Sequence, residues 1–233
     1  GREDYDYITP GREGTELMTV PGNLSSPLLA TATAAAAAAE YVIPKSLRFN
    51  SADSSHLTRT PSSAGNRRTF TFSTWLKRCE TGQDHRLFES SESTADQTTI
   101  KFIGARLQVF DRQSNNVKMN LQTSRVFRDL SAWYHIVVAI DTTQSTESNR
   151  VKVYINGVQE TSFSTSTYPS QNQEFYLNQA NKPYDIGRFR GGSGSGSQAL
   201  NGYLADIQFV DGQQLAPTDF GETRSSDGVW VPK

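Results

Sequence analysis

The sequence predicts an all-β protein, a two-sheet antiparallel sandwich that follows an extended N-terminal arm. From Leu47 onward, apolar and polar residues alternate with a period of two, which is typical of strands with one buried face. Turn residues interrupt this alternation every ~8–15 residues. The pattern gives about a dozen short strands, which one open sheet does not hold without curling, so two stacked sheets are expected.

Residues 1–40 are predicted to form the arm, because prolines and glycines interrupt them and an alanine run ends them. Ser26 and Pro27 suit the N-cap and the first position of a short helix over Leu28–Glu40. A helix of about three turns is marginal on its own. Two interpretations stay open: a linker, or an anchoring segment that orders only against a partner chain.

Residues 41–222 are predicted to form the sandwich, and residues 223–233 a C-terminal extension that continues in a longer chain. The expected strands, in chain order, are Leu47–Asn50, Phe70–Lys77, Arg86–Glu89, Thr98–Ile103, Arg106–Phe110, Asn116–Leu121, His135–Ile140, Arg150–Ile155, Glu174–Leu177, Tyr184–Gly187 and Gly202–Val210. Their inward faces are expected to share one core, made of Phe70, Phe72, Leu76, Ile136, Val138, Ile140, Val153, Ile155, Ile207 and Phe209.

Two tight turns are well specified. Asn156-Gly157 lies between apolar residues and predicts a type I′ hairpin, because both central positions of that turn need positive φ. Gly104-Ala105 separates two strand patterns. Three polar loops are expected at the rim of the sandwich, where binding residues usually lie: Thr142–Asn149, Ser162–Gln173 and Arg190–Gln198.

Composition and charge exclude several functional classes. The 23 Lys and Arg residues balance 24 Asp and Glu, so a net charge of −1 gives no field for nucleic acid or an anionic membrane. The single cysteine, Cys79, excludes a disulfide framework and a cysteine-rich zinc module. No apolar run is long enough to cross a bilayer. We therefore expect no nucleic acid partner and no membrane insertion.

The sequence shows no catalytic pattern, and we expect that the protein is not an enzyme. The glycine-rich loop Arg190–Gly196 is not followed by Gly-Lys-Ser/Thr, and no Gly-x-Ser-x-Gly elbow precedes a helix. His56, His85 and His135 are too far apart for a paired metal motif. A glycanase on a sandwich scaffold typically carries a Glu-x-Asp-x-Glu alternation, which is missing here.

Calcium is the one cofactor that the residues leave open, because a rim site can be assembled from a few carboxylates, amides and backbone carbonyls. Asp111, Asp141 and Asp185 each follow or lie in an expected strand and are the candidates. An ordinary solvated turn is the alternative interpretation of each position. No other metal or cofactor is predicted.

A ligand surface is expected on the loops. The face of a pyranose ring is apolar and packs on aromatic rings, while its hydroxyls need polar side chains. The loops supply this mixture through Tyr168, Asn172, Tyr184, Arg188 and Gln198. A merely polar rim is the alternative interpretation.

Three stretches of sequence carry a recognisable pattern. Trp133–Ala139 contains Trp-x-His, Val151–Gly157 ends in the Asn-Gly turn, and Tyr184–Arg188 is followed by Leu200–Ile207. In order and spacing they resemble the laminin-G-like, concanavalin A-type jelly-roll family, over about residues 45–222. The resemblance implies a jelly-roll sandwich. It does not choose among glycan, protein and lipid ligands or glycanase activity.

Gly202–Gln213, with Asp219-Phe220-Gly221 after it, is more specific. It is similar to a subgroup of that family found in bacteriophage virion proteins, in which the chain continues beyond the equivalent of Asp227–Lys233. Ala205 stands where many members of the wider family have an acidic residue. The resemblance therefore supplies no calcium ligand at that position.

These observations lead to one main hypothesis and two alternatives. The main hypothesis is a non-catalytic bacteriophage virion protein, structural or adhesive, in a tail fibre or associated with the capsid. Its partners would be other virion proteins, copies of itself and a host surface glycan. The first alternative is an extracellular carbohydrate-binding module of a larger bacterial protein, and the second is a glycan-cleaving enzyme.

Overall fold

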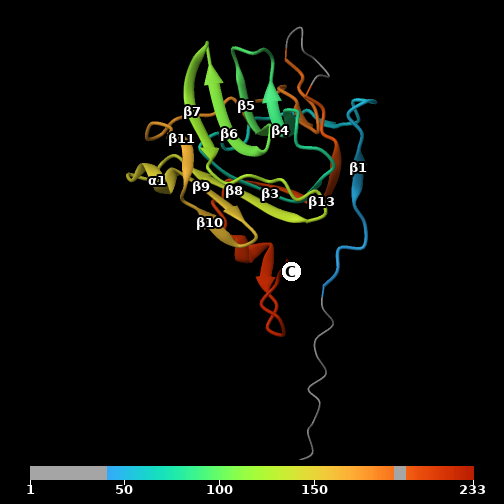
Figure 1. The fold of residues 1–233 in the computed structure, drawn as a ribbon. Helices are drawn as coiled ribbons and strands as arrows, with labels where there is room; N and C mark the ends of the chain where they lie inside the picture. The colour runs from blue at the N-terminus through green and yellow to red at the C-terminus, as the bar shows by residue number, and fades with distance from the viewer. Residues whose placement is uncertain (1–40, 192–197) are drawn as a thin grey trace, which may run out of the picture. The chain divides into compact units, whose positions relative to one another are not determined.

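The computed structural model describes residues 41–191 and 198–233, which form two antiparallel sheets stacked face to face (Figure 1). The predicted all-β sandwich is confirmed, because the one α-helix of these residues, α1 (Glu147–Arg150), is a single turn. Among the residues described, no helix has the length and apolar character needed to cross a membrane. The predicted arm over residues 1–40, with its short helix, lies outside them.

One layer is a six-stranded sheet in the order β1-β13-β3-β8-β9-β10, and its neighbouring strands pair antiparallel. A bulge interrupts the pairing of β13 with β3 where Asp206 adopts a φ of 47°. The strands of this layer are β1 (Leu47–Phe49), β3 (Thr69–Arg78), β8 (Tyr134–Asp141), β9 (Val151–Ile155), β10 (Val158–Glu160) and β13 (Gly202–Asp211).

The other layer is a seven-stranded sheet in the order β11-β7-β6-β5-β4-β12-β2, also antiparallel throughout. Sequence analysis did not predict its short edge strands β2 and β11. The strands are β2 (Leu57–Arg59), β4 (His85–Ser91), β5 (Gln97–Ile103), β6 (Arg106–Gln113), β7 (Asn116–Thr123), β11 (Phe163–Thr167) and β12 (Tyr184–Ile186).

The two sheets share one apolar core, as the alternation predicts. Phe72 of β3 stacks on Phe88 of β4, with ring centroids 4.7 Å apart, and so joins the two layers. Ile207 and Phe209 pack against the core half-buried. The other predicted members are buried within it: Phe70, Phe72, Leu76, Ile136, Val138, Ile140, Val153 and Ile155.

Backbone conformation confirms the predicted hairpin between β9 and β10. Asn156 and Gly157 have φ values of 50° and 79°, as a type I′ turn requires. Gly202 serves a different purpose, because a Cβ at that position would lie 2.5 Å from the carbonyl oxygen of Lys77. The close contact of β13 with β3 therefore depends on glycine.

The structure corrects the prediction of a strand at residues 174–177. Phe175 and Leu177 do enter the core. However, the backbone N–H groups of Tyr176 and Leu177 donate to the side chains of Asp111 (3.1 Å) and Thr98 (3.0 Å) instead of to a neighbouring strand. Because side-chain acceptors replace the strand ladder, this segment is buried without being a strand.

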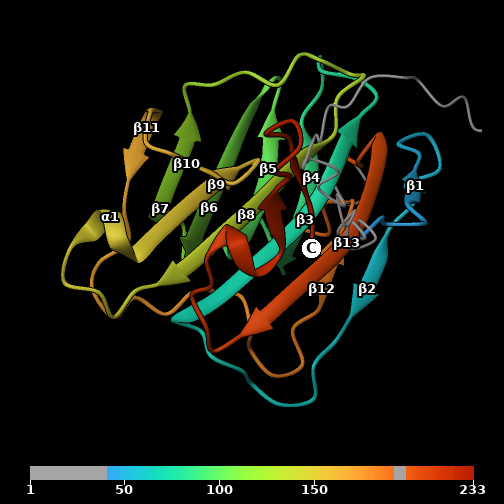
Figure 2. The ribbon, with the colours of Figure 1, turned by 90° about the horizontal axis from the view of Figure 1, so that it is seen from below.

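The C-terminal residues form a separate hairpin of β14 (Gly221–Thr223) and β15 (Trp230–Pro232), preceded by the 3-10 turn η2 (Pro217–Asp219). Figure 2 shows it against the outer side of the six-stranded sheet, away from the other layer. There Trp230 stacks on His135 of β8, with ring centroids 6.0 Å apart. Part of the predicted C-terminal extension therefore packs on the sandwich.

Candidate functional site

The outer side of the seven-stranded sheet is covered with polar and cationic side chains, and we call it the polar face. Side chains alternate between the core and this face along each strand, so cross-strand register places the outward ones in rows. The rows are Arg86, Lys101, Gln108 and Gln122, then Glu89, Thr99, Phe110 and Asn120, and last Gln97 with Arg112.

Phe110 is the aromatic centre of the polar face. Lys101 Nζ lies 5.5 Å from its ring centroid and Arg112 Cζ lies 5.2 Å away, so two cations flank one ring. Burial lowers the pKa of Lys101 to about 8, and the charge of Arg86 acts in the same direction. Beside the ring, Gln108 Nε2 donates to Asn120 Oδ1 at 2.8 Å. The centre of the polar face thus combines an aromatic ring, two cations and two amides.

Arg86 organises the side of the polar face on β4. Its guanidinium donates to the side-chain oxygens of Gln97 (3.2 Å) and Thr99 (2.9 Å) and lies 4.5 Å from the Phe189 ring centroid. Arg86 Nη1 also lies 3.1 Å from Glu89 Oε2, an ion pair that lacks hydrogen-bond geometry. Burial raises the pKa of Glu89 despite this cation.

Asp185 of β12 sits beside Glu89 in the antiparallel register. Its carboxylate accepts hydrogen bonds from Arg190, from Thr58 Oγ1 at 2.5 Å and from Arg188 Nε at 3.3 Å. Burial acts to raise the pKa of Asp185, but the Arg190 and Thr58 hydrogen bonds outweigh it and the pKa is lowered. Asp185 is therefore a carboxylate held ionised by arginines.

The structure separates the five predicted ligand residues. Gln198 and Arg188 lie at the β4–β12 side of the polar face, where Gln198 Oε1 accepts from Arg86 Nε at 2.8 Å and Arg188 contacts Asp185. Tyr184 is buried against the core, and its hydroxyl donates to Asn178. Gln198 and Arg188 therefore lie on the same side of the polar face, whereas the Tyr184 ring points into the core.

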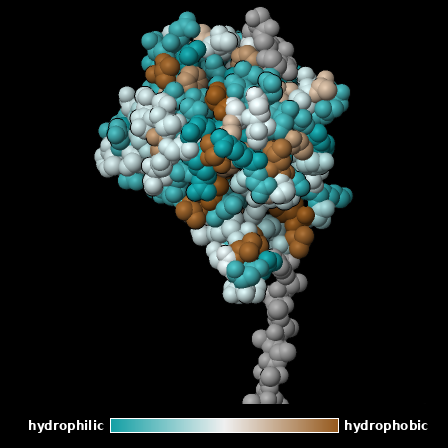
Figure 3. Space-filling model, in the orientation of Figure 1, coloured by the Kyte–Doolittle hydropathy of each residue, from teal (hydrophilic) through white to brown (hydrophobic). Residues whose placement is uncertain are grey.

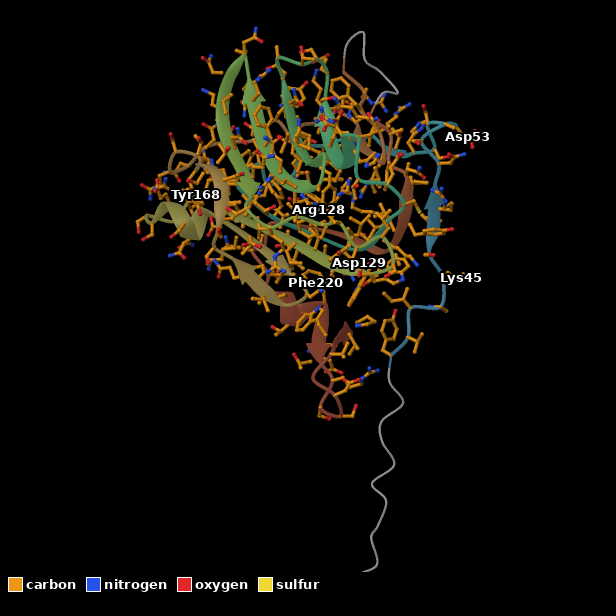
Figure 4. The ribbon with its side chains drawn as sticks, viewed as in Figure 1. Lys45, Asp53, Arg128, Asp129, Tyr168 and Phe220 are labelled. Atoms are coloured by element: carbon orange, nitrogen blue, oxygen red, sulfur yellow. The ribbon has the colours of Figure 1, made fainter. Side chains whose placement is uncertain are left out.

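Tyr168 and Asn172 lie elsewhere. Figure 4 shows Tyr168 beside α1, on the far side of the molecule from Lys45. Its ring packs half-buried against the core. The backbone N–H of Asn172 donates to the Thr142 carbonyl oxygen at 2.8 Å. The predicted surface therefore divides into two separate parts.

The three calcium candidates also lie apart, and each has protein donors. Asp111 accepts from Thr98 Oγ1 at 2.5 Å and from Gln113 Nε2 at 2.9 Å. Asp141 accepts from Thr143 and Gln144, while Asp185 is held by arginines. Within residues 41–191 and 198–233, no group of three or more His, Cys, Asp or Glu side chains is placed to hold a metal ion.

Sequence reasoning missed the polar face because its residues look like ordinary solvent-facing positions of strands. The polar face could have been found from the types of side chain at the outward positions of three successive strands. Lys101, Gln108, Arg112 and Asn120 are long or amide-bearing side chains, and Phe110 breaks the polar pattern. Only the cross-strand register shows that they surround one ring.

Comparison with known proteins agrees with this fold. A family model described as the concanavalin A-like lectin/glucanases superfamily (Laminin_G_3) matches residues 50–217. No curated protein sequence matches the chain.

Several solved structures are similar in fold. Domains LG4-5 of the mouse laminin α1 chain match with a TM-score of 0.52 at 12% identity, over 76% of this chain and 45% of that one. A putative carbohydrate-binding protein from Bacteroides ovatus matches with a TM-score of 0.51 at 12% identity, over 80% and 50%. The CBM40 domain of the Ruminococcus gnavus IT-sialidase matches with a TM-score of 0.50 at 11% identity, over 70% and 95%.

Proposed function

Since the chain belongs to the concanavalin A-like lectin/glucanases superfamily, we propose that it is a non-catalytic glycan-binding domain whose ligand lies on the polar face. The observation that carries the proposal is the arrangement around Phe110, where Lys101, Arg112, Gln108 and Asn120 meet on three adjacent strands. Two of the structurally similar proteins are named for carbohydrate binding, which supports the same class of ligand.

The chemistry of the polar face suits sugar hydroxyls. Amide side chains donate and accept at once, and guanidinium and ammonium groups form charge-assisted hydrogen bonds. Gln108 Oε1 and Arg112 Nε are buried and have no hydrogen-bond partner among the described residues, so a ligand that displaces their neighbours would give each a partner. Their placement on the strands of a sheet favours binding without rearrangement of the backbone.

The carboxylates of the polar face support a non-catalytic role. Glu89 and Asp185 are the two that lie side by side, and both are fully buried. Glycoside hydrolysis needs one carboxyl group that donates a proton and a second that attacks or activates water. The arginine contacts of Asp185 leave it poorly suited to either role. A reducing-end assay on the bound glycan should detect no cleavage, and product formation would favour the glycanase alternative.

The binding proposal is tested by screening the full chain on a glycan array and measuring the best ligand by calorimetry. Gln108→Leu removes one amide at nearly constant volume, and we expect affinity to fall about tenfold. Lys152→Met, on β9 of the other sheet, is the control and should bind normally. Unchanged affinity of Gln108→Leu would move the ligand away from the polar face. We propose that binding needs no cofactor, so a loss of affinity in EDTA would instead indicate calcium.

A second proposal concerns where the domain is displayed. The similarity of Gly202–Gln213 to phage virion proteins supports a place on a virion, with residues 1–40 as the attachment to the particle or to sister chains. Mass spectrometry of purified particles should find the chain, and deleting residues 1–40 should abolish its incorporation while glycan binding persists. Incorporation of the deleted chain would overturn the anchoring role.

A further inference from the structure

All three tryptophans of the chain line one cleft on the outer side of the six-stranded sheet, which we call the tryptophan cleft. Trp75 comes from β3, Trp133 from the segment before β8, and Trp230 from β15. Residues 43–46 form another part of the wall, and the cleft has a volume of about 360 Å³. Such a volume lies at the lower end of the range of small-molecule sites.

The position of the cleft is visible in two views. Figure 4 shows Lys45 and Phe220 on the lower side of the sandwich, with Lys45 on the segment that leads into β1 and Phe220 at the base of the hairpin. Figure 3 shows apolar side chains at the same end of the molecule. Val42 and Val229 are among the exposed apolar residues of these two segments. The cleft is thus open at an apolar end of the molecule.

Trp230 is a fixed wall of the cleft. Its indole N–H donates to His135 Nδ1 at 2.9 Å, and the other imidazole nitrogen lies 2.9 Å from Ser73 Oγ. Because indole nitrogen only donates, His135 Nδ1 accepts and the imidazole proton is on Nε2. A Cβ at Gly157 would lie 2.5 Å from the Trp230 ring, so the turn between β9 and β10 also packs against it.

Trp75 supplies an unused donor. Its ring stacks on His135, with centroids 4.8 Å apart, and its side chain is only 8% exposed. Its indole nitrogen has no hydrogen-bond partner among the described residues, which is costly for a buried polar group. Trp133, by contrast, is 38% exposed at the mouth of the cleft. The nitrogen itself is shielded from solvent, so a ligand oxygen that displaces its neighbours would give it the missing acceptor, while the rings hold the apolar face of the ligand.

The polar side-chain groups of the tryptophan cleft are all hydrogen-bond donors. Besides the Trp230 indole, which donates to His135, they are the indole N–H groups of Trp75 and Trp133, the Lys45 ammonium and the Ser46 hydroxyl, and none of the described side chains that line the cleft is acidic. The two indoles and the ammonium can only donate hydrogen bonds. The best ligand therefore combines an apolar ring face with an anionic acceptor. A pyranose that carries a carboxylate meets both requirements.

A second hollow, of about 470 Å³, adjoins the first and shares Lys45, Ser46 and Ala205 with it. Its lining is mainly aliphatic and includes Leu57, but it also contains Asp206. An acetamido group matches this combination, because its methyl group is apolar and its N–H can donate to a carboxylate. The carboxylate of Asp206 would repel a second acidic sugar there.

We propose that these two hollows form a second glycan site that binds a uronic acid in the tryptophan cleft and an N-acetylhexosamine in the adjoining hollow. The proposal rests on the proposed function, since it assigns the glycan class to a surface opposite the polar face. Lys45 and Trp75 select the carboxylate, and the three indole rings hold the pyranose face.

The test uses the full chain and a tetrasaccharide of alternating glucuronic acid and N-acetylglucosamine. Because every tryptophan lines the cleft, intrinsic tryptophan fluorescence reports occupancy there directly. We expect emission to change in a saturable way that matches the calorimetric titration. The same tetrasaccharide with its carboxyl groups reduced to alcohols should bind at least fivefold more weakly, and so should the N-deacetylated form.

Variants connect each ligand group to a side chain. Lys45→Met should bind the acidic and the carboxyl-reduced tetrasaccharides equally, whereas Lys152→Met should keep the preference of the parent. Trp75→Phe keeps an aromatic ring but removes the donor, and it should lose at least fivefold in affinity. If Trp75→Phe does not fold, Lys45→Met, whose side chain is at the exposed mouth, still decides the question.

The outcomes separate this site from the polar face. Calorimetric binding without any change in emission, abolished by Gln108→Leu, would overturn the second site and leave the proposed function intact. Equal affinity of the parent for the acidic and the reduced tetrasaccharides would also overturn it. Absence of binding to every glycan of the array would overturn both proposals.

Discussion

The two outer surfaces of the sandwich differ in chemistry, although alternating strands build both. On the seven-stranded sheet, outward positions carry Lys101, Gln108 and Arg112, and these side chains pack closely around Phe110, so that Gln108 and Phe110 are less than 10% exposed. On the six-stranded sheet, outward positions carry Trp75 and His135, and the C-terminal hairpin packs on them. Polar side chains let a sheet face water directly, whereas an aromatic surface needs a cover.

This difference shows how one scaffold can offer two kinds of site. The polar face is formed by neighbouring strands whose register fixes the spacing of its side chains. The tryptophan cleft is assembled from segments that are distant in sequence, and its shape depends on how the hairpin is held. Perturbing the shared core should damage both surfaces, and perturbing His135 or Lys101 should affect one of them.

The largest effect is expected from Phe72→Ala. Phe72 is fully buried and stacks on Phe88 of the opposite sheet, so its removal leaves a cavity between the layers that support both surfaces. We expect the free energy of unfolding to fall by roughly 3–5 kcal/mol. Chemical denaturation measures this change, and a midpoint equal to that of the parent would contradict the assignment of Phe72 to the shared core.

The second largest effect is expected from acidification, which should destabilise the part of the molecule where the C-terminal hairpin packs on the sheet. Burial lowers the pKa of His135 from its ordinary value of 6.5 to about 4. The folded state therefore binds a proton at His135 less readily than the unfolded state. The contribution of neutral His135 to the free energy of unfolding is fully present above about pH 6.5 and declines as the pH falls toward 4. A shift of this size corresponds to at most about 3 kcal/mol.

Denaturation midpoints between pH 4 and pH 7 measure the effect, with His135→Gln as the comparison. The variant should show a weaker pH dependence. It should keep some, because burial also lowers the pKa of His85. A pH dependence identical to that of the parent would show that His135 does not link protonation to folding.

Trp230→Phe should produce a smaller change that separates packing from hydrogen bonding in the cleft wall. The ring remains, but the indole donor to His135 Nδ1 is lost. We expect a loss of about 1 kcal/mol in unfolding free energy. The free nitrogen should also accept a proton more readily, so the pKa of His135, measured by NMR titration, should rise. An unchanged pKa would argue that burial alone lowers it.

The contrast between the two surfaces also explains what sequence reasoning could predict. Period-two alternation identifies the strands and the core, and Asn156-Gly157 identifies its hairpin, because these features depend on local geometry. The prediction fails at residues 174–177, where Asp111 and Thr98 from distant positions take the place of a strand ladder. It also places Tyr184 on a ligand surface, and the structure places that ring in the core.

The candidate sites were harder to predict because they are formed by residues that are distant in the sequence. The contact of Trp230 with His135 spans 95 residues, and nothing near either residue in the sequence announces it. The polar face depends on which outward residues become neighbours across three strands. Side-chain type was visible in the sequence, whereas register and docking are long-range properties of the fold.

The smallest effect, and the one that distinguishes the polar face most directly, is a loss of glycan affinity at alkaline pH. Burial lowers the pKa of Lys101 to about 8, so its ammonium loses a proton between pH 7 and 9 while arginine stays charged. We expect glycan affinity at the polar face to fall a few-fold over this range, because a charge-assisted hydrogen bond becomes a neutral one. Unfolding does not explain such a loss. A lysine whose pKa is lowered by folding makes the protein more stable as the pH rises from about 8 toward 10.5. Lys101→Arg should abolish the pH dependence and keep the cation beside Phe110. If calorimetry shows the same alkaline loss in Lys101→Arg as in the parent, the titrating group lies elsewhere and the ligand does not contact Lys101.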